Sequence, residues 1–302
     1  MASPPSRRTF ELQGHRGARG LFPENTLEGF TAAIRLGVDA LELDVAITRD
    51  GVPVVFHDMT LSPEIARDAT GAWITRADIA IHRLTRLQLA EYDVGRLRPG
   101  SAYAARHPDQ VALDGTRIPD LEAVLRLTAA AGVRADIELK SSPERPDLTT
   151  APEDIADRVM ALVDRLDAVE GVDLRSFDWR SLLHLRRTRP DLRLTWLTDA
   201  RTERDHARWW GPSSPADPVA AVVAVADRAT SPCWAPEAGG LTLQQVTAAR
   251  KAGLRLVPWT VNDPALMRRI MDWGVDGICT DRPDLAREVM RLAGLPVPPS
   301  RG

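Results

Sequence analysis

The chain has 302 residues, of which 44% are hydrophobic and 27% charged, a composition that excludes an intrinsically disordered protein and allows a sizeable core. The formal net charge of -3 excludes a broad electrostatic attraction to nucleic acid or to an anionic membrane. No run is long and apolar enough to cross a bilayer and no secretory signal is visible. We therefore expect a cytoplasmic protein that binds no nucleic acid and does not insert stably into membranes.

Short apolar segments alternate with amphipathic stretches along most of the chain, which is the pattern of parallel βαβ units. Several amphipathic stretches end in a glycine, as in Leu36-Gly37-Val38, where a helix needs a left-handed residue before the next strand. Eight such strands close a barrel, so the sequence predicts an α/β fold of the TIM (βα)8 class. The predicted strands are 11–15, 40–45, 135–139, 172–176, 193–197, 230–234, 255–259 and 277–280, and the predicted helices include 26–36, 121–131, 152–166, 181–187, 242–252 and 263–273.

We expect one domain over residues 10–295, with flexible tails at 1–9 and 296–302. Residues 58–115 follow the second barrel strand, interrupt the regular alternation and are rich in Gly, Pro and Asp. This segment is therefore predicted to be an insertion that forms an irregular cap on one barrel mouth. Cys233 and Cys279 lie in apolar runs and are expected to be reduced, buried thiols. A homodimer is left open.

The first predicted strand ends in Gly14-His15-Arg16-Gly17. Functional groups of parallel barrels lie at the carboxyl ends of the strands, which makes this a candidate site segment. The glycines let the backbone approach a ligand, and Arg16 offers a bidentate fork for phosphate. His15 is a candidate for proton transfer, although a single histidine is more often structural. Further along, Asn25 and Glu28 are spaced as in a capping box, so helix initiation is sufficient to explain Asn25.

The second predicted strand carries Glu42 and Asp44, which are two residues apart and therefore project from the same face. Acidic residues in such pairs usually face solvent, which is the alternative interpretation. Here Leu41, Leu43 and Val45 occupy the other face and would pack under the helices, which turns both acids into the barrel. Two buried neighbouring carboxylates are relieved by a cation or by protonation. Oxygen ligands of this kind favour Mg²⁺ or Ca²⁺ over zinc.

A second candidate histidine, His57, follows the apolar run 52–56 and precedes Asp58, at a point where a strand meets a loop. Histidine is the side chain best suited to proton transfer near neutral pH, which makes a pair of histidines useful as acid and base. A structural role is again the alternative for His57 taken alone.

The predicted strand at 135–139 places Glu138 and Lys140 on one face, so a third carboxylate and a cation join the same mouth. Lys140 is a compact charge suited to a phosphate oxygen, and a simple buried Glu–Lys ion pair is the alternative. Trp259 ends the strand at 255–259, where its ring would either wall the site or fill the core.

Together these motifs resemble the glycerophosphodiester phosphodiesterase family, and the resemblance covers nearly the whole predicted barrel. No single motif is decisive, but their order and spacing are specific. The matching stretches are Gly14-His15-Arg16-Gly17, Pro23-Glu24-Asn25-Thr26, Glu42-Leu43-Asp44-Val45, Pro53-Val54-Val55-Phe56-His57-Asp58, Ile118-Pro119-Asp120-Leu121-Glu122, Ile137-Glu138-Leu139-Lys140, Trp259-Thr260-Val261-Asn262 and Asp276-Gly277-Ile278-Cys279-Thr280-Asp281.

The resemblance implies a TIM barrel that hydrolyses glycerophosphodiesters, as small-molecule substrates, to sn-glycerol 3-phosphate and an alcohol. It implies that His15 and His57 act as general base and general acid and that one Mg²⁺ or Ca²⁺ ion takes part. Water or the glycerol 2-hydroxyl would be the nucleophile. By the same resemblance the phosphate is held by Arg16 and Lys140, and the metal by Glu42, Asp44 and Glu138.

Two alternatives differ in their sequence requirements. A phospholipase D-like enzyme would cleave (lyso)phospholipids to a cyclic phosphate, but the secreted relatives of that kind usually carry a disulfide in an early loop, and neither feature is visible here. A barrel that only binds phosphodiesters should lack one of the two histidines or one of the three carboxylates, and this chain lacks none of them.

Overall fold

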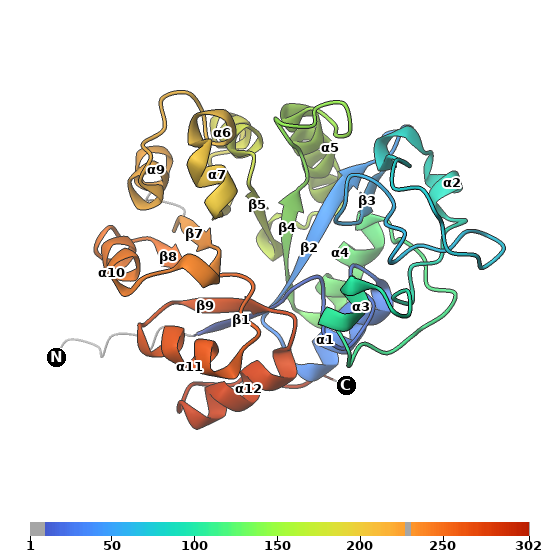
Figure 1. The fold of residues 1–302 in the computed structure, drawn as a ribbon. Coiled ribbons are helices and arrows are strands. Elements are labelled where there is room, and N and C mark those ends of the chain that lie inside the picture. The colour runs from blue at the N-terminus through green and yellow to red at the C-terminus, as the bar shows by residue number, and fades with distance from the viewer. Residues whose placement is uncertain (1–9, 227–230, 302) are drawn as a thin grey trace.

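The computed structural model describes residues 10–226 and 231–301, and it confirms a parallel eight-stranded barrel surrounded by helices (Figure 1). Neighbouring strands pair in the order β8-β7-β6-β5-β4-β2-β1-β9. Backbone hydrogen bonds from Asp276 N to Leu256 O (2.9 Å) and from Cys279 N to Pro258 O (3.0 Å) join the β8 segment to β9 and bring the two ends of this order together. The barrel strands are β1 (Glu11–Gly14), β2 (Ala40–Ile47), β4 (Arg134–Leu139), β5 (Val172–Ser176), β6 (Leu194–Thr198), β7 (Cys233–Pro236), β8 (Arg255–Leu256) and β9 (Gly277–Thr280).

Amphipathic helices cover the outside of the barrel and bury their apolar stripes against the strands, which forms the main core. Glycines cap two of these helices as the sequence predicts: Gly37 ends α1 and Gly132 ends α4, both in the left-handed region, with φ of 93° and 62°. The outer helices are α1 (Leu27–Leu36), α4 (Leu121–Ala131), α5 (Pro152–Arg165), α6 (Trp179–Thr188), α7 (Ala200–Arg204), α8 (His206–Trp209), α9 (Pro218–Val225), α10 (Leu243–Lys251), α11 (Pro264–Asp272) and α12 (Pro283–Leu292).

The segment after β2 turns back along it as β3 (Pro53–Val55), an antiparallel strand off the barrel path. The chain then runs through α2 (Arg86–Leu89) and α3 (Ala102–Arg106) before it re-enters the barrel at α4. A second, smaller apolar cluster that includes Phe56, Leu61 and Ile81 lies within this region. The segment thus has a small core of its own and lies at one side of the barrel, beside α1 and α4 (Figure 1).

The expected tail at 1–9, Gly302 and the first residue of the strand expected at 230–234 lie outside the described residues. The described part of the expected C-terminal tail contacts the turn between α1 and β2, since Arg301 donates to Val38 O at 2.9 Å. Its flexibility stays a prediction. Among the described helices, none combines the length and the apolar character that a membrane span needs.

Candidate functional site

A cavity of about 290 Å³ lies at the carboxyl ends of the barrel strands, and every candidate site residue except Asp44 lines it. Asp44 is fully buried beside it and contacts Lys140 of the lining. The sequence-based set is therefore brought together in space. The lining residues are His15, Arg16, Glu42, His57, Asp58, Met59, Glu138, Lys140, Arg175, Phe177, Leu197, Asp199, Arg201, Trp259 and Cys279.

A tight turn after β1 presents His15 and Arg16 to this cavity. A Cβ atom on Gly14 would lie 2.2 Å from Gly17 O, so only glycine fits the start of the turn. Arg16 and Gly17 follow with positive φ angles of 51° and 93°. The turn places the Arg16 amide 3.0 Å from Glu42 Oε2, to which it donates a hydrogen bond.

His15 is buried and accompanied by a carboxylate from the last barrel strand. Its Nδ1 atom lies 2.6 Å from Asp281 Oδ1, and its Nε2 atom lies 3.8 Å from Glu42 Oε2. Since a carboxylate can only accept, this contact assigns the ring proton to Nδ1 and leaves Nε2 as the acceptor. Burial lowers the pKa of His15 to about 3, with Arg19 acting in the same direction, and outweighs the opposite effect of Asp281. His15 is therefore neutral at pH 7.

The three predicted carboxylates lie on adjacent strands in matching register. Asp44 on β2 is paired with Glu138 on β4, and Glu42 lies one step earlier on the same face of β2. Each of the three offers an oxygen within 4.8 Å of the others, and all are buried. Asp44 Oδ1 accepts no hydrogen bond although it is buried. A buried, unsatisfied oxygen within a set of hard oxygen donors fits a Mg²⁺ or Ca²⁺ ion.

The charges around the triad explain how the acids coexist. Burial raises the pKa of Glu42 to about 8, and the neighbouring Asp44 adds to the rise. For Asp44 burial also raises the pKa, but His57, Arg16 and Lys140 outweigh it and hold the pKa well below its usual range. In the absence of a metal ion, the pocket thus favours a protonated Glu42 beside an ionised Asp44.

Lys140 and Arg16 flank these carboxylates. Lys140 Nζ lies 2.7 Å from Glu138 Oε1 and 3.4 Å from Asp44 Oδ1, so the buried Glu–Lys pair considered from the sequence is present next to the triad. Arg16 donates through Nη1 to Glu24 Oε1 at 2.9 Å, and its Nε lies 3.2 Å from Asp44 Oδ2. Both cations border the cavity and could attract a phosphate.

Asn25 corrects one sequence-based expectation. The residue that caps α1 is Thr26, whose side chain accepts from Gly29 N. Asn25 instead has a φ of 54° and donates through Nδ2 to Asp44 Oδ2 at 2.9 Å. The left-handed backbone turns its amide towards the carboxylate, so Asn25 positions a candidate metal ligand rather than starting the helix.

His57 lines the cavity and lies two residues after the end of β3. Its Nδ1 atom is 2.6 Å from Asp58 Oδ1, and its side chain is 32% exposed, so this histidine is far more open than His15. Trp259 forms another wall: it packs edge-on against Phe177 with ring centroids 5.2 Å apart and donates from Nε1 to Ala235 O at 2.9 Å. Trp259 is thus among the residues that line the cavity.

Two residues of the site were given no role from the sequence. Asp281 directly follows β9, and its position at the carboxyl end of a barrel strand was the available signal. Arg175 lies inside β5, is fully buried and donates through Nη1 to Asp136 Oδ2 at 2.9 Å on the floor of the barrel. A charged residue within a predicted core strand was its signal, because buried charges need a partner.

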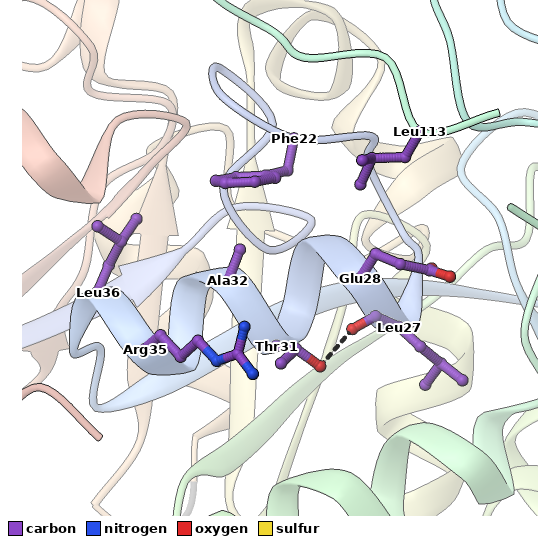
Figure 2. A pocket seen from close by; sticks show the side chains of 8 residues that line it. All are labelled: Phe22, Leu27, Glu28, Thr31, Ala32, Arg35, Leu36 and Leu113. Atoms are coloured by element: carbon purple, nitrogen blue, oxygen red, sulfur yellow. Dashed lines mark hydrogen bonds between the residues drawn. The ribbon is translucent and has the colours of Figure 1, made fainter. Parts of the chain in front are cut away.

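A larger cavity, of about 550 Å³, lies away from these groups on the outer side of α1 (Figure 2). Phe22, Ala32, Leu36 and Leu113 give it a largely apolar lining. The acid triad and both candidate histidines line or adjoin the smaller cavity instead, so the chemistry belongs there.

Comparison with known proteins agrees with this geometry. The sequence model of the glycerophosphoryl diester phosphodiesterase family matches residues 15–285. A glycerophosphodiester phosphodiesterase from Bacillus subtilis is 30% identical, over 92% of this chain and 85% of its own length. The solved structure of a candidate glycerophosphoryl diester phosphodiesterase from Silicibacter pomeroyi is 35% identical, with a TM-score of 0.86 over 96% of this chain and 95% of that one. An Oleispira antarctica phosphodiesterase, solved with the product sn-glycerol-3-phosphate, shares the fold at 20% identity and a TM-score of 0.66, over 93% of this chain and 96% of that one.

Proposed function

Because this chain belongs to the glycerophosphoryl diester phosphodiesterase family, we propose that it hydrolyses glycerophosphodiesters to sn-glycerol 3-phosphate and an alcohol by metal-dependent catalysis, with His15 and His57 as base and acid. The observation that carries the proposal is the meeting of three buried carboxylates with both histidines around one cavity. The product named for the Oleispira antarctica structure supports the choice of substrate.

Glu42, Asp44 and Glu138 would hold one divalent ion, Mg²⁺ or Ca²⁺. When bound, such an ion offsets negative charge on the phosphate oxygens. Arg16 and Lys140 border the same space and would bind the phosphate, while Trp259 gives the substrate an apolar wall. The substrate is thus held by charge at the phosphate and by aromatic contact beside it.

The two histidines differ in a way that suits opposite roles. His15 is neutral, its Nδ1 is occupied by Asp281, and its Nε2 is left to accept the proton of the attacking hydroxyl, from water or from the glycerol 2-hydroxyl. His57 is more exposed than His15 and its Nδ1 lies against Asp58, which orients the ring, so we assign it the role of general acid. When water attacks, protonation of the leaving alcohol by His57 completes the exchange. When the 2-hydroxyl attacks, the same protonation leaves a cyclic phosphate, and water must then open one ring P–O bond to give sn-glycerol 3-phosphate.

The test is turnover of glycerophosphocholine, followed by phosphorus NMR with and without EDTA. We expect sn-glycerol 3-phosphate as the phosphorus product, loss of turnover in EDTA and recovery with Mg²⁺ or Ca²⁺. His57→Gln should lower kcat by about 10²- to 10⁴-fold, the usual contribution of a general acid. His184→Gln is the matched control, because His184 pairs with Asp157 on α5, away from the cavity.

Three results would contradict the proposal: full activity in EDTA, equal kcat for the two histidine variants, or no turnover by the wild-type protein. A cyclic phosphate product from lysophosphatidylcholine, without glycerol 3-phosphate, would favour the phospholipase D-like alternative. The cytoplasmic location stays a prediction, which cell fractionation would check, and the oligomeric state stays open to analytical ultracentrifugation.

A further inference from the structure

Tyr103 is a residue through which the insertion at 58–115 contacts the loop that carries His15 and Arg16. It lies on α3, and its ring packs edge-on against His107 with centroids 5.0 Å apart. Its hydroxyl lies between two charged groups of the loop after β1: it donates to Glu24 Oε2 and accepts from Arg19 Nη1 at 3.1 Å. The Tyr103 hydroxyl therefore contacts both Glu24 and Arg19. Each of these two residues begins a separate chain of contacts that leads into the site, and we call these chains the two arms.

The first arm leads to the metal-binding carboxylates. Glu24 receives Tyr103 on Oε2 and Arg16 on Oε1, the latter at 2.9 Å. Arg16 in turn lies 3.2 Å from Asp44 through its Nε. Glu24 and Arg16 are 8% exposed, so water offers them little alternative hydrogen bonding. The position of the Arg16 guanidinium therefore depends on the Glu24 carboxylate, whose other oxygen is bound by Tyr103.

The second arm leads to the histidine on β1. Arg19 contacts Asp281 through two parallel hydrogen bonds, Nε to Oδ1 and Nη2 to Oδ2, both at 2.9 Å. Asp281 Oδ1 also lies 2.6 Å from His15 Nδ1. A bidentate contact fixes the plane of the carboxylate, and the carboxylate fixes the ring of the histidine.

Further contacts hold the insertion against the same loop. Gln110 donates to Arg19 O at 2.8 Å, and the backbone amide of Val111 donates to Leu21 O at 2.9 Å. Asp109 pairs with Arg282, next to Asp281, at 2.8 Å. The stretch that follows α3 is thus held against the loop by hydrogen bonds and an ion pair, which fixes the position of Tyr103 relative to Glu24 and Arg19.

We propose that Tyr103 is a positioning residue, through which the insertion holds both His15 and Arg16 in their working orientations. The inference rests on the proposed function for its kinetic consequence. The hydroxyl separates Glu24 from Arg19 and satisfies both. Without it, each loses a partner in a buried setting, and the two opposite charges can pair directly, which would draw Arg19 from Asp281 or Glu24 from Arg16.

Tyr103→Phe tests this, because it keeps the ring against His107 and removes only the hydroxyl. We expect kcat for glycerophosphocholine to fall about 10- to 100-fold, as is usual when a partner of a site residue is removed, with KM changed less than about threefold. Tyr92→Phe is the matched control, since Tyr92 packs against the small core of the same insertion. That variant should retain the wild-type kcat.

A second readout needs neither turnover nor metal. The short contact between His15 and Asp281 should give a low-field proton resonance, assigned by its loss in His15→Gln. We expect this resonance to shift or broaden in Tyr103→Phe and to stay in place in Tyr92→Phe, with thermal unfolding midpoints of both variants within about 5 °C of wild type.

The inference is overturned if Tyr103→Phe keeps the wild-type kcat and resonance. It is also overturned if both tyrosine variants lose activity in proportion to their loss of folded protein, because the hydroxyl would then serve only stability. Absence of turnover in the wild-type protein would contradict the proposed function alone, since the resonance still decides the positioning role.

Discussion

His15 Nδ1 lies 2.6 Å from Asp281 Oδ1, so the residue that follows the last barrel strand, β9, orients the histidine that follows the first strand, β1. The two strands pair in parallel, with Gly14 opposite Thr280, which brings the residues after each strand side by side. Asn262, from the segment after β8, adds a hydrogen bond from Nδ2 to Asp281 Oδ2 at 2.7 Å. The orientation of the candidate base is therefore a consequence of barrel closure.

Asp281→Asn should lower kcat by about 10- to 100-fold with little change in KM. An amide can donate to Nδ1 and so favour the wrong tautomer, which leaves Nε2 without its acceptor lone pair. Steady-state kinetics on glycerophosphocholine measures the effect. Asp284→Asn is the control, since Asp284 pairs with Arg282 at the start of α12. Equal kcat values for the two variants would remove Asp281 from the orientation of His15.

Metal affinity should depend on pH through Glu42. Without a cation, burial and Asp44 raise the pKa of Glu42 to about 8, and a divalent ion binds the ionised carboxylate. Below pH 8 binding must therefore release a proton, and the affinity should fall about tenfold per pH unit, whereas above pH 8 it should level off. Calorimetry with Mg²⁺ and Ca²⁺ in buffers of different ionisation enthalpy measures both quantities.

Two variants separate this effect from general electrostatics. Glu42→Gln should bind metal more weakly and release no proton from this site. Glu122→Gln should behave as wild type, because Glu122 lies on the exposed side of α4, where it pairs with Arg126 and Arg165. An affinity that is independent of pH between 6 and 8 in the wild-type protein would contradict the role given to Glu42.

Gly14→Ala should abolish activity and destabilise the protein by about 1–3 kcal/mol, because overpacking forces the backbone to move. The added Cβ would lie 2.2 Å from Gly17 O, in the turn that carries His15 and Arg16. Gly171→Ala is a fair control, since a Cβ there meets nothing within 4 Å and its backbone needs no positive φ. Urea unfolding and the glycerophosphocholine assay report on the two effects. Equal stability of both variants would show that the turn can relax.

Much of the fold could be predicted because its signals are local. The period-two pattern of β2 and the glycine that ends α1 each lie within a few residues of the element they describe. Shorter elements in the β6–β7 connection, such as α7 and α8, were not among the predicted helices. Helices of four or five residues are too short for a hydrophobic period to be read from them.

The site divides in the same way. Glu42, Asp44 and Glu138 could be expected to meet, because parallel strands bring their carboxyl ends to one mouth. The hydrogen-bond partners of the site residues could not be paired from the sequence, since Asn25 and Asp44 are 19 residues apart, Tyr103 and Glu24 are 79 apart, and Asp281 and His15 are 266 apart. Asn25 shows the cost of a purely local interpretation, because its spacing fits a helix cap that Thr26 provides.

By itself the sequence determined the barrel class, the residue types at the mouth and the strands that carry them, because alternation along a strand decides which side chains share a face. The tertiary structure alone decided which nitrogen of His15 is left to accept a proton, what holds Arg16, and that the insertion reaches both through Tyr103. These contacts join segments that are distant in the chain, and hydrogen bonds depend on distances of a few tenths of an ångström that only the packed barrel defines.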